Sequence, residues 1–333
     1  DRLTIYGVAV LKIRNSMLLY RNLYILCSFL FLATGCTGRD AKEQASGHPE
    51  SPQVFSLPAV PGVLATPQER AEYLVTRYWE NFNFRDTALI SRPEVTEQAL
   101  ADFLDLLPRV SPGTAHSSLI AMMDSASADS SMYAHFMGLA EKYLYNPNSP
   151  FHNEEYYIPV LRQIMASSRL GDIGKVRPAY QLEMALKNRP GEVASDFVYT
   201  RTNGSRGRLS RLSADYTLLF FNSPDCEECR RLKEYIAASE LLSGLASRKR
   251  PRPRLVILAV YPDEDVALWK SASYPSCMLN VHDASQSVTA RRLYDLRAIP
   301  TLYLLDADKR VLLKDAPVER VERYLRAALF ESE

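Results

Sequence analysis

Apolar residues recur at helical spacing through the first half of the chain. Thr66-Pro67-Gln68-Glu69 is typical of a helix start, because threonine can cap, proline suits the first turn and glutamate can close a capping box. Apolar side chains then recur every three or four residues, at positions 74, 75, 78, 79 and 82. The same spacing predicts helices from about Pro93 and over about 114–126, 130–145, 154–168 and 174–187. Since no strand-like alternation precedes residue 190, residues 66–189 are predicted to form an all-helical domain with its aromatic stripe in the core.

The pattern changes at Arg189-Pro190-Gly191, beyond which β-favouring runs alternate with helical segments. Residues 197–209 predict a hairpin, residues 216–221 and 255–261 two buried strands, and residues 301–313 a second hairpin. Helical segments are expected from Cys229 to about Ala246, over 264–272 and 287–296, and from about Pro317 to Phe330. This order predicts an α/β domain over residues 190–333, with a mixed sheet flanked by helices.

A short apolar run near the N-terminus has the composition of a secretion signal. Counted from Met17, a basic segment with Arg21 precedes an uncharged run over residues 23–34, followed by Gly35-Cys36. The run is shorter than the roughly 18 residues expected of a membrane-spanning helix. Residues 1–36 are therefore interpreted as an upstream segment and a signal peptide, in which Cys27 would be discarded. The polar, proline-containing residues 37–65 are predicted to be a flexible tether.

The end of the signal segment, Leu32-Ala33-Thr34-Gly35-Cys36, resembles a bacterial lipobox. The resemblance implies cleavage before Cys36, lipidation of Cys36, and a protein that is held to a bacterial membrane by its lipid anchor. An ordinary secretory signal with a chance cysteine is the alternative, and both place the mature protein outside the cytoplasm, where disulfide chemistry is permitted. No acidic run of the kind that resembles a surface-export tag follows Cys36, so we expect the protein to face the periplasm.

Composition narrows the classes of partner. Forty Lys plus Arg against 39 Asp plus Glu leave a net charge of +1, which gives no reason to expect a nucleic-acid partner. The basic run over residues 248–254 matches a nuclear or nucleic-acid signal by pattern, but behind a secretion signal we expect a solvated connection. Five cysteines in 333 residues exclude a disulfide-framework mini-fold, so their positions matter more than their number.

Two of the cysteines form the motif Cys226-Glu227-Glu228-Cys229, between a predicted strand and a predicted helix. A cysteine at a helix N-terminus meets unpaired backbone N–H groups and the positive end of the helix dipole, which favour its thiolate. A partner three residues later lies one turn away and can close a small, reducible disulfide. The exposed thiolate can then attack a substrate disulfide, and the second thiol can resolve the mixed disulfide.

The C-terminal half resembles the thioredoxin fold, in particular the TlpA-like and ResA-like branch of membrane-tethered proteins. The likeness rests on the C-x-x-C pair, on Ala298-Ile299-Pro300-Thr301 immediately before a strand, and on the opening segment Gly191–Phe197. It implies that Cys226 is the attacking thiol, Cys229 the resolving thiol and Pro300 a cis-proline that shapes substrate docking. The candidate residues of the substrate loop are Asp225, Glu227, Glu228 and Ile299.

The helical half resembles, over Tyr73–Phe82 and Val95–Gln98, a domain of unknown function that precedes thioredoxin-like domains in certain Gram-negative lipoproteins. That likeness implies architecture and no mechanism. Together the resemblances imply a membrane-anchored thiol–disulfide oxidoreductase that acts on protein disulfides and depends on an upstream redox partner. No cofactor is expected, because the dithiol itself carries the electrons.

The surroundings of the dithiol depart from the thioredoxin pattern. Asn222 stands where tryptophan is usual, Phe220 where a buried acid assists proton transfer, and Asp225 where an aromatic residue precedes the first cysteine. Two glutamates also separate the cysteines. Because nearby negative charge opposes thiolate formation, we expect a less acidic Cys226 and a reductase or isomerase direction.

Two alternatives compete with a redox dithiol. In the first, the chain is a non-catalytic binding or assembly lipoprotein, and its thioredoxin fold is a scaffold. In the second, Cys277 and His282 join the pair as a Cys₃His zinc site, but the separation is unusual and the pair would be permanently metallated, so no metal is expected. Cys277 is instead expected to be a lone thiol in a loop or a small buried residue.

Overall fold

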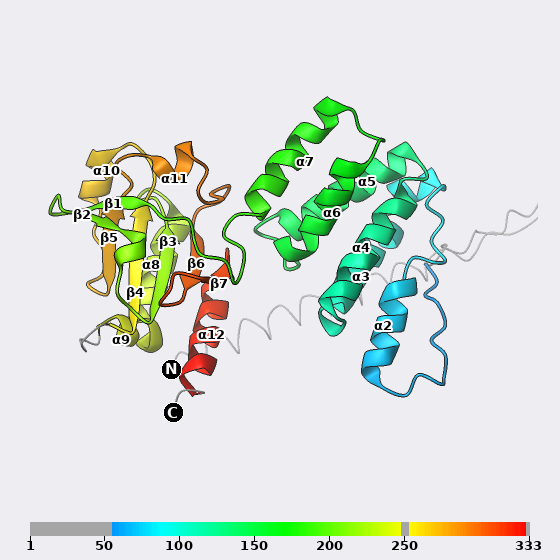
Figure 1. Cartoon of the computed structure of the whole chain (residues 1–333), viewed down its shortest axis with the longest axis horizontal. Helices are drawn as coiled ribbons and strands as arrows, with labels where there is room; N and C mark the ends of the chain where they lie inside the picture. The colour runs from blue at the N-terminus through cyan, green and yellow to red at the C-terminus, as the bar shows by residue number, and fades with distance from the viewer. Residues whose placement is uncertain (1–54, 248–252, 331–333) are drawn as a thin grey trace, which may run out of the picture. The chain divides into compact units, whose positions relative to one another are not determined.

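The N-terminal segment and part of one loop lie outside the described residues of this computed structural model, which are 55–247 and 253–330 (Figure 1). Cys27, Cys36, most of the predicted tether and residues 248–252 of the basic run therefore lie outside the described residues. Within the described ranges, no helix is long and apolar enough to cross a membrane.

Six α-helices occupy the first half of the described chain. They are α2 (Pro67–Arg77), α3 (Pro93–Leu106), α4 (Pro112–Ala126), α5 (Ser130–Ala140), α6 (Glu154–Ala166) and α7 (Asp172–Ala185). The predicted capping box forms at α2, where the Thr66 hydroxyl accepts the Glu69 N–H at 3.1 Å and the Glu69 carboxylate accepts the Thr66 N–H at 3.0 Å. The helix predicted over 130–145 ends as an α-helix at Ala140 and continues as one π-helical turn, Glu141–Tyr145.

The predicted aromatic stripe lies in the core of the helical half. The Trp79 ring centroid lies 5.2 Å from that of Tyr78, 5.5 Å from that of Phe103 and 5.4 Å from that of Phe136. All three pairs meet edge to face, a geometry that contributes about 0.5–1.5 kcal/mol a pair beyond the area that it buries. These rings therefore hold the helices together, and the interpretation as core is confirmed.

A mixed sheet of seven described strands forms the second half, in the order β2-β1-β5-β4-β3-β6-β7. The strands are β1 (Val198–Arg201), β2 (Arg206–Arg208), β3 (Tyr216–Phe221), β4 (Leu255–Tyr261), β5 (Met278–His282), β6 (Thr301–Leu305) and β7 (Val311–Lys314). β3 runs parallel to β4 and antiparallel to β6. Helices α8 (Glu227–Ala238), α9 (Glu240–Ser247) and α12 (Val318–Phe330) pack on one face, and α11 (Ser287–Ala290) packs on the other, while α10 (Val266–Ser271) follows β4 (Figure 1). The predicted fold class, a mixed sheet flanked by helices after an all-helical half, is confirmed.

Three predicted details of the second half are wrong. The helix expected from Cys229 to Ala246 begins at Glu227 and breaks at Ser239, whose hydroxyl accepts the Leu242 N–H at 3.2 Å. The sequence pattern predicted no strand at β5, because this strand is short and carries the polar Asn280. The Asn280 side-chain oxygen accepts a hydrogen bond from the Trp269 indole N–H at 2.7 Å. The helical pattern over 287–296 yields only the four residues of α11, because Arg292 turns the chain with a φ of 50°.

A cluster of buried charges joins the two halves, which belong to one compact unit, Gln53–Glu333. Glu154, in the first turn of α6, pairs with Lys314 at 2.6 Å and with Arg297 at 3.0 Å. Asp295 and Asp315 also pair with Arg297. Three carboxylates therefore share two cations, and burial raises the pKa of Asp315 to about 6.

We predict that Asp315→Asn stabilises the protein at neutral and alkaline pH. Because the pKa of Asp315 is raised from 3.8 to about 6 in the folded state, its ionisation lowers stability as the pH rises through that range. A gap of two pH units corresponds to at most roughly 3 kcal/mol. Asparagine also tolerates the φ of 43° at this position.

Urea denaturation at pH 4, 6 and 8 measures the free energy of unfolding of this variant. We expect a gain at pH 8 that disappears near pH 4, and no such trend for the matched control Asp308→Asn, whose side chain is exposed. A variant that is less stable than the wild type at both pH 4 and pH 8 would contradict the prediction, since the contact with Arg297 would then outweigh the burial of a third carboxylate.

Candidate active site

The first cysteine caps the helix that follows the central strand β3. After β3 ends at Phe221, residues 222–225 make the turn, and the Cys226 N–H donates to the Ser223 carbonyl at 3.3 Å. Cys226 is the N-cap of α8, and its Sγ accepts the Cys229 N–H at 3.1 Å. The positive end of the α8 dipole thus lies against the sulfur, which favours a thiolate when the pair is reduced.

The two cysteines of the motif form a disulfide and differ in exposure. Their Cα atoms are 5.2 Å apart. Cys229 is 2% exposed and packs in the apolar layer beneath α8, whereas Cys226 is half-buried at the edge of that layer. Cys226 is therefore the sulfur that an incoming thiol or disulfide can reach.

The loop before β6 lies beside the Cys226 sulfur. β6 pairs antiparallel with β3 and places Thr301 opposite Phe221, the last residue of β3. The Ile299–Pro300 peptide bond is cis, and the Ile299 carbonyl oxygen lies 3.7 Å from Cys226 Sγ. Residues 73 positions apart in the sequence thus meet through one strand pairing.

The acidic candidates of the substrate loop are exposed, namely Asp225, Glu227 and Glu228. Two of them carry ion pairs within α8, because Glu227 lies 2.6 Å from Arg230 and Glu228 lies 2.7 Å from Arg231. The hydrogen bond from Arg230 lowers the pKa of Glu227. These arginines offset the negative charge on which the expectation of a less acidic Cys226 depends. Sequence reasoning missed them, although their spacing of three residues from each glutamate is a visible signal.

A polar network lies at the end of β3, at the position where thioredoxin carries its tryptophan. Asn222 is 2% exposed, and its amide donates to the carbonyls of Phe220 at 2.9 Å and Val260 at 3.2 Å. The Tyr274 hydroxyl donates to Asn222 Oδ1 at 2.5 Å, and the Lys233 ammonium lies 4.5 Å from the centre of the Tyr274 ring. Burial raises the pKa of Tyr274 to about 12, so this hydroxyl stays a donor. No sequence signal could find this pair, since 52 residues separate its members.

The third cysteine of the described residues, Cys277, and its candidate partner His282 make separate contacts. Cys277 is a free, half-buried thiol that packs against the same apolar layer as Cys229, and burial raises its pKa. His282 Nε2 donates to the Asp263 carbonyl at 2.8 Å. In the part of the chain that the structure describes, no group of three or more His, Cys, Asp and Glu side chains is placed to hold a metal ion.

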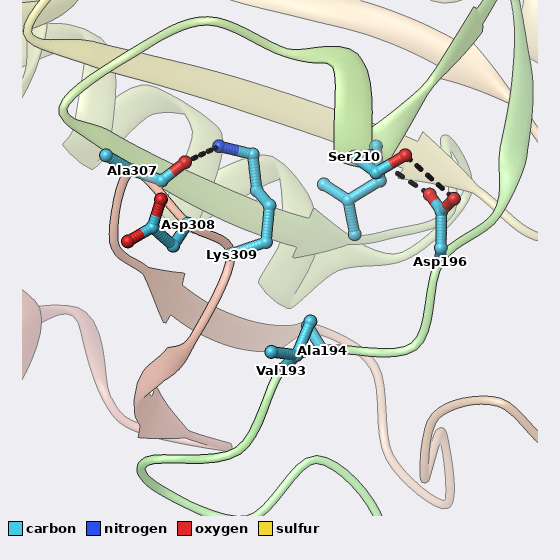
Figure 2. Close-up of a pocket in the computed structure, with 8 residues that line it drawn as sticks. Val193, Ala194, Asp196, Ser210, Ala307, Asp308 and Lys309 are labelled. Atoms are coloured by element: carbon cyan, nitrogen blue, oxygen red, sulfur yellow. Dashed lines mark hydrogen bonds between the residues drawn. The ribbon is translucent and has the colours of Figure 1, made fainter.

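A cavity of about 260 Å³ lies beside the turn between β6 and β7 (Figure 2). The Asp196 carboxylate in its wall accepts the Ser210 N–H at 3.0 Å and the Ser210 hydroxyl at 2.8 Å. The Lys309 ammonium donates to the Ala307 carbonyl at 3.0 Å. Because β6 runs from Pro300, beside Cys226, towards this turn, the cavity lies at the far end of β6 from the dithiol.

Comparison with solved structures finds a similar chain that covers both halves. A thioredoxin-like protein from Bacteroides caccae, known from a crystal structure, is 43% identical, and the match covers 83% of this chain and 99% of that chain with a TM-score of 0.79. The matched share is larger than either half alone, so one superposition includes residues from both halves.

Two further similarities are shorter. The C-terminal domain of an uncharacterized protein from Bacteroides fragilis is 42% identical and matches over 42% of this chain and 98% of that chain, with a TM-score of 0.40. The thioredoxin domain of a thiol-disulfide oxidoreductase from Bacteroides vulgatus is 16% identical and matches over 42% of this chain and 96% of that chain, with a TM-score of 0.33. Both TM-scores are below 0.5.

Sequence comparison relates the helical half to a family. A family model described as a domain of unknown function, DUF5106, matches residues 35–188. A search of curated proteins found no match. The helical half therefore has relatives whose description names no activity.

We predict that the double substitution Arg230→Gln and Arg231→Gln slows alkylation of reduced Cys226 at pH 7. It leaves Glu227 and Glu228 uncompensated beside the sulfur, which disfavours the thiolate. Because both ion pairs are exposed and screened by salt, we expect about two- to threefold slower alkylation at low ionic strength and less in high salt.

Iodoacetamide labelling in a Cys277→Ser background, followed by peptide mass spectrometry, measures this rate. Arg326→Gln is the matched control, since that arginine is exposed on α12. Alkylation that stays unchanged or becomes faster would mean that the two arginines do not support the thiolate.

Proposed function

The chain belongs to the thioredoxin-like proteins, and on that basis we propose that it is a thiol–disulfide oxidoreductase acting on protein disulfides through Cys226 and Cys229. The observation that carries the proposal is the asymmetry of the disulfide. Cys226 is half-buried at the start of α8 and lies 3.7 Å from the Ile299 carbonyl, while Cys229 is 2% exposed beneath it. One sulfur can meet a client, and the other can reach only its neighbour.

In the reducing direction, the Cys226 thiolate attacks one sulfur of a client disulfide. A disulfide between Cys226 and the client forms, the client S–S bond breaks, and the second client sulfur leaves as a thiolate that takes a proton from solvent. Cys229 then loses its proton and attacks Cys226 Sγ, which releases the first client sulfur and closes the Cys226–Cys229 disulfide. The client gains two electrons and two protons, and a partner protein with its own dithiol returns both to this chain.

The proton of Cys229 leaves without help from the position that carries an acid in thioredoxin. Phe220 occupies this position, is fully buried, and lies in the same apolar layer as Cys229. Without that acid, the proton of Cys229 passes to the departing client sulfur or to solvent. We favour the reductase or isomerase direction, because the negative charges of Glu227 and Glu228 oppose formation of the Cys226 thiolate. The ion pairs that the two glutamates make with Arg230 and Arg231 reduce this effect.

A lipid anchor and a position on the periplasmic side complete the proposal. The anchor rests on the sequence of residues 17–36, in which an apolar run ends at Cys36, and the periplasmic side rests on the lack of an acidic run directly after Cys36. A membrane-anchored dithiol would act on clients that are themselves outside the cytoplasm, where disulfides form and persist.

A binding or assembly role, with the disulfide as a structural link, is the second candidate. The observation that favours it is an exposed apolar row on α7, made by Ile173, Val176 and Tyr180 at 92%, 68% and 44% exposure. These residues lie on one helical face, since their spacing is three and four. Such an exposed apolar row suits contact with another protein. In this role the Cys226–Cys229 disulfide would be structural.

We predict that the reduced protein cleaves a disulfide-linked peptide dimer and that Cys226→Ser abolishes the reaction. Loss of the nucleophile should lower the rate at least about 100-fold, because Cys229 is too buried to replace it. Release of the free peptide thiol, measured with a thiol-reactive dye, gives the rate.

Cys277→Ser is the matched control for this experiment and should react at the wild-type rate, since Cys277 lies outside the disulfide. Equal rates for the wild type and Cys226→Ser would reject the oxidoreductase and leave the binding role.

A further inference from the structure

The arginine that precedes the cis-proline loop is held by the helical half. Arg297 is 19% exposed, and its Nη2 lies 3.0 Å from Glu154 Oε1 on α6. Its guanidinium also lies 3.6 Å from the centre of the Tyr145 ring, in the π-helical turn after α5. Glu154 lies 143 positions before Arg297 in the sequence and Tyr145 lies 152 positions before it. Both contacts therefore depend on the packing of the two halves.

The turn that carries Arg297 is fixed from within as well. The Asp295 carboxylate accepts the Arg297 N–H at 3.2 Å, pairs with the Arg297 guanidinium, and accepts the Tyr145 hydroxyl at 3.0 Å. The backbone between Arg297 and Ile299 is therefore held at one end by Tyr145 and Glu154. At its other end, the Ile299 carbonyl lies 3.7 Å from Cys226 Sγ.

Glu154 is the residue on which this arrangement depends. Its carboxylate is 6% exposed and pairs with Arg297 and with Lys314. Burial acts to raise its pKa, but Lys314 and Arg297 outweigh that effect and hold the pKa of Glu154 below its usual range. A buried ion pair is strongly destabilised when one partner is removed, so the ionised Glu154 carboxylate fixes the position of the Arg297 guanidinium.

We propose that the helical half positions the cis-proline loop for client binding, through Glu154 and Tyr145 acting on Arg297. Arg297 is a positioning residue, since it lies two residues before Ile299 and acts on the client only through the loop. The inference rests on the proposed oxidoreductase function. It gives the domain of unknown function a role in the same site.

Other contacts hold the halves together without touching this loop. The Lys187 ammonium donates to the Arg292 carbonyl at 2.8 Å, and the Asn188 amide donates to the Leu293 carbonyl at 2.7 Å. Glu155 pairs with Arg189 inside the helical half. The crystal structure of the Bacteroides caccae protein also superimposes in one operation with residues of both halves. The packing of the halves therefore does not depend on Glu154 alone, and Glu155→Gln is a matched control from the same turn of α6.

The test compares Glu154→Gln with Glu155→Gln in the intact reduced protein. Initial rates with a disulfide-linked peptide dimer, at low dithiothreitol, give KM and kcat. We expect Glu154→Gln to raise KM about 3- to 10-fold with kcat changed less than about twofold, and Glu155→Gln to leave both near the wild type. If Glu154 acts through Arg297, the double variant Glu154→Gln/Arg297→Gln should be no worse than Arg297→Gln alone.

Two further measurements keep the result decisive. Tyr145→Phe removes only the hydroxyl that Asp295 accepts, so it should fold and still raise KM about two- to threefold. Hydrogen exchange of residues 296–305 in the oxidised protein needs no activity, and it should be faster in Glu154→Gln than in Glu155→Gln.

An inactive wild type would reject the proposed function. The hydrogen exchange of residues 296–305 would then be the remaining test of the positioning role. An active wild type whose KM and exchange are the same in Glu154→Gln, Tyr145→Phe and Glu155→Gln would overturn the positioning role and leave the function intact.

Discussion

The register between β3 and β6 decides where chemistry can occur in this protein. Opposing Phe221 with Thr301 brings the end of one strand, where the cysteine turn begins, to the start of the other, where the cis-proline loop ends. A slip by one residue would turn every side chain of β6 to the other face of the sheet and move the Ile299 carbonyl away from Cys226. The register is fixed by burial on both faces, since all five residues of β6 are buried.

Two further features complete the site that this register brings together. The first is the asymmetry of the disulfide, because α8 starts just beyond the end of the interior strand β3 and turns Cys229 into the apolar layer, while Cys226 stays half-buried. The second is a contact between the helical half and the start of the cis-proline loop, in which Glu154 pairs with Arg297. The dithiol is thus set by local helix geometry, and the surface that would meet a client is set by packing between segments far apart in sequence.

Sequence reasoning found what local patterns and family resemblance encode. The capping box at Thr66, the central strands and the dithiol with its proline loop all have signals within a few neighbouring residues. It missed β5, whose strand character comes from pairing on both sides rather than from its own short and partly polar sequence. It also missed the link from Glu154 to Arg297, since 143 residues separate two charges that would be unremarkable alone. Contacts of this kind become visible only when the chain is folded.

The central claim, that Cys226 is the client-facing sulfur of a redox dithiol, is tested most directly by trapping. Reduced Cys229→Ser protein, which cannot resolve a mixed disulfide, is incubated with a disulfide-linked peptide dimer and mapped by mass spectrometry. The account predicts a stable adduct of one peptide at Cys226 and none at Cys277. An adduct at Cys277, or no adduct on a folded protein, would contradict it.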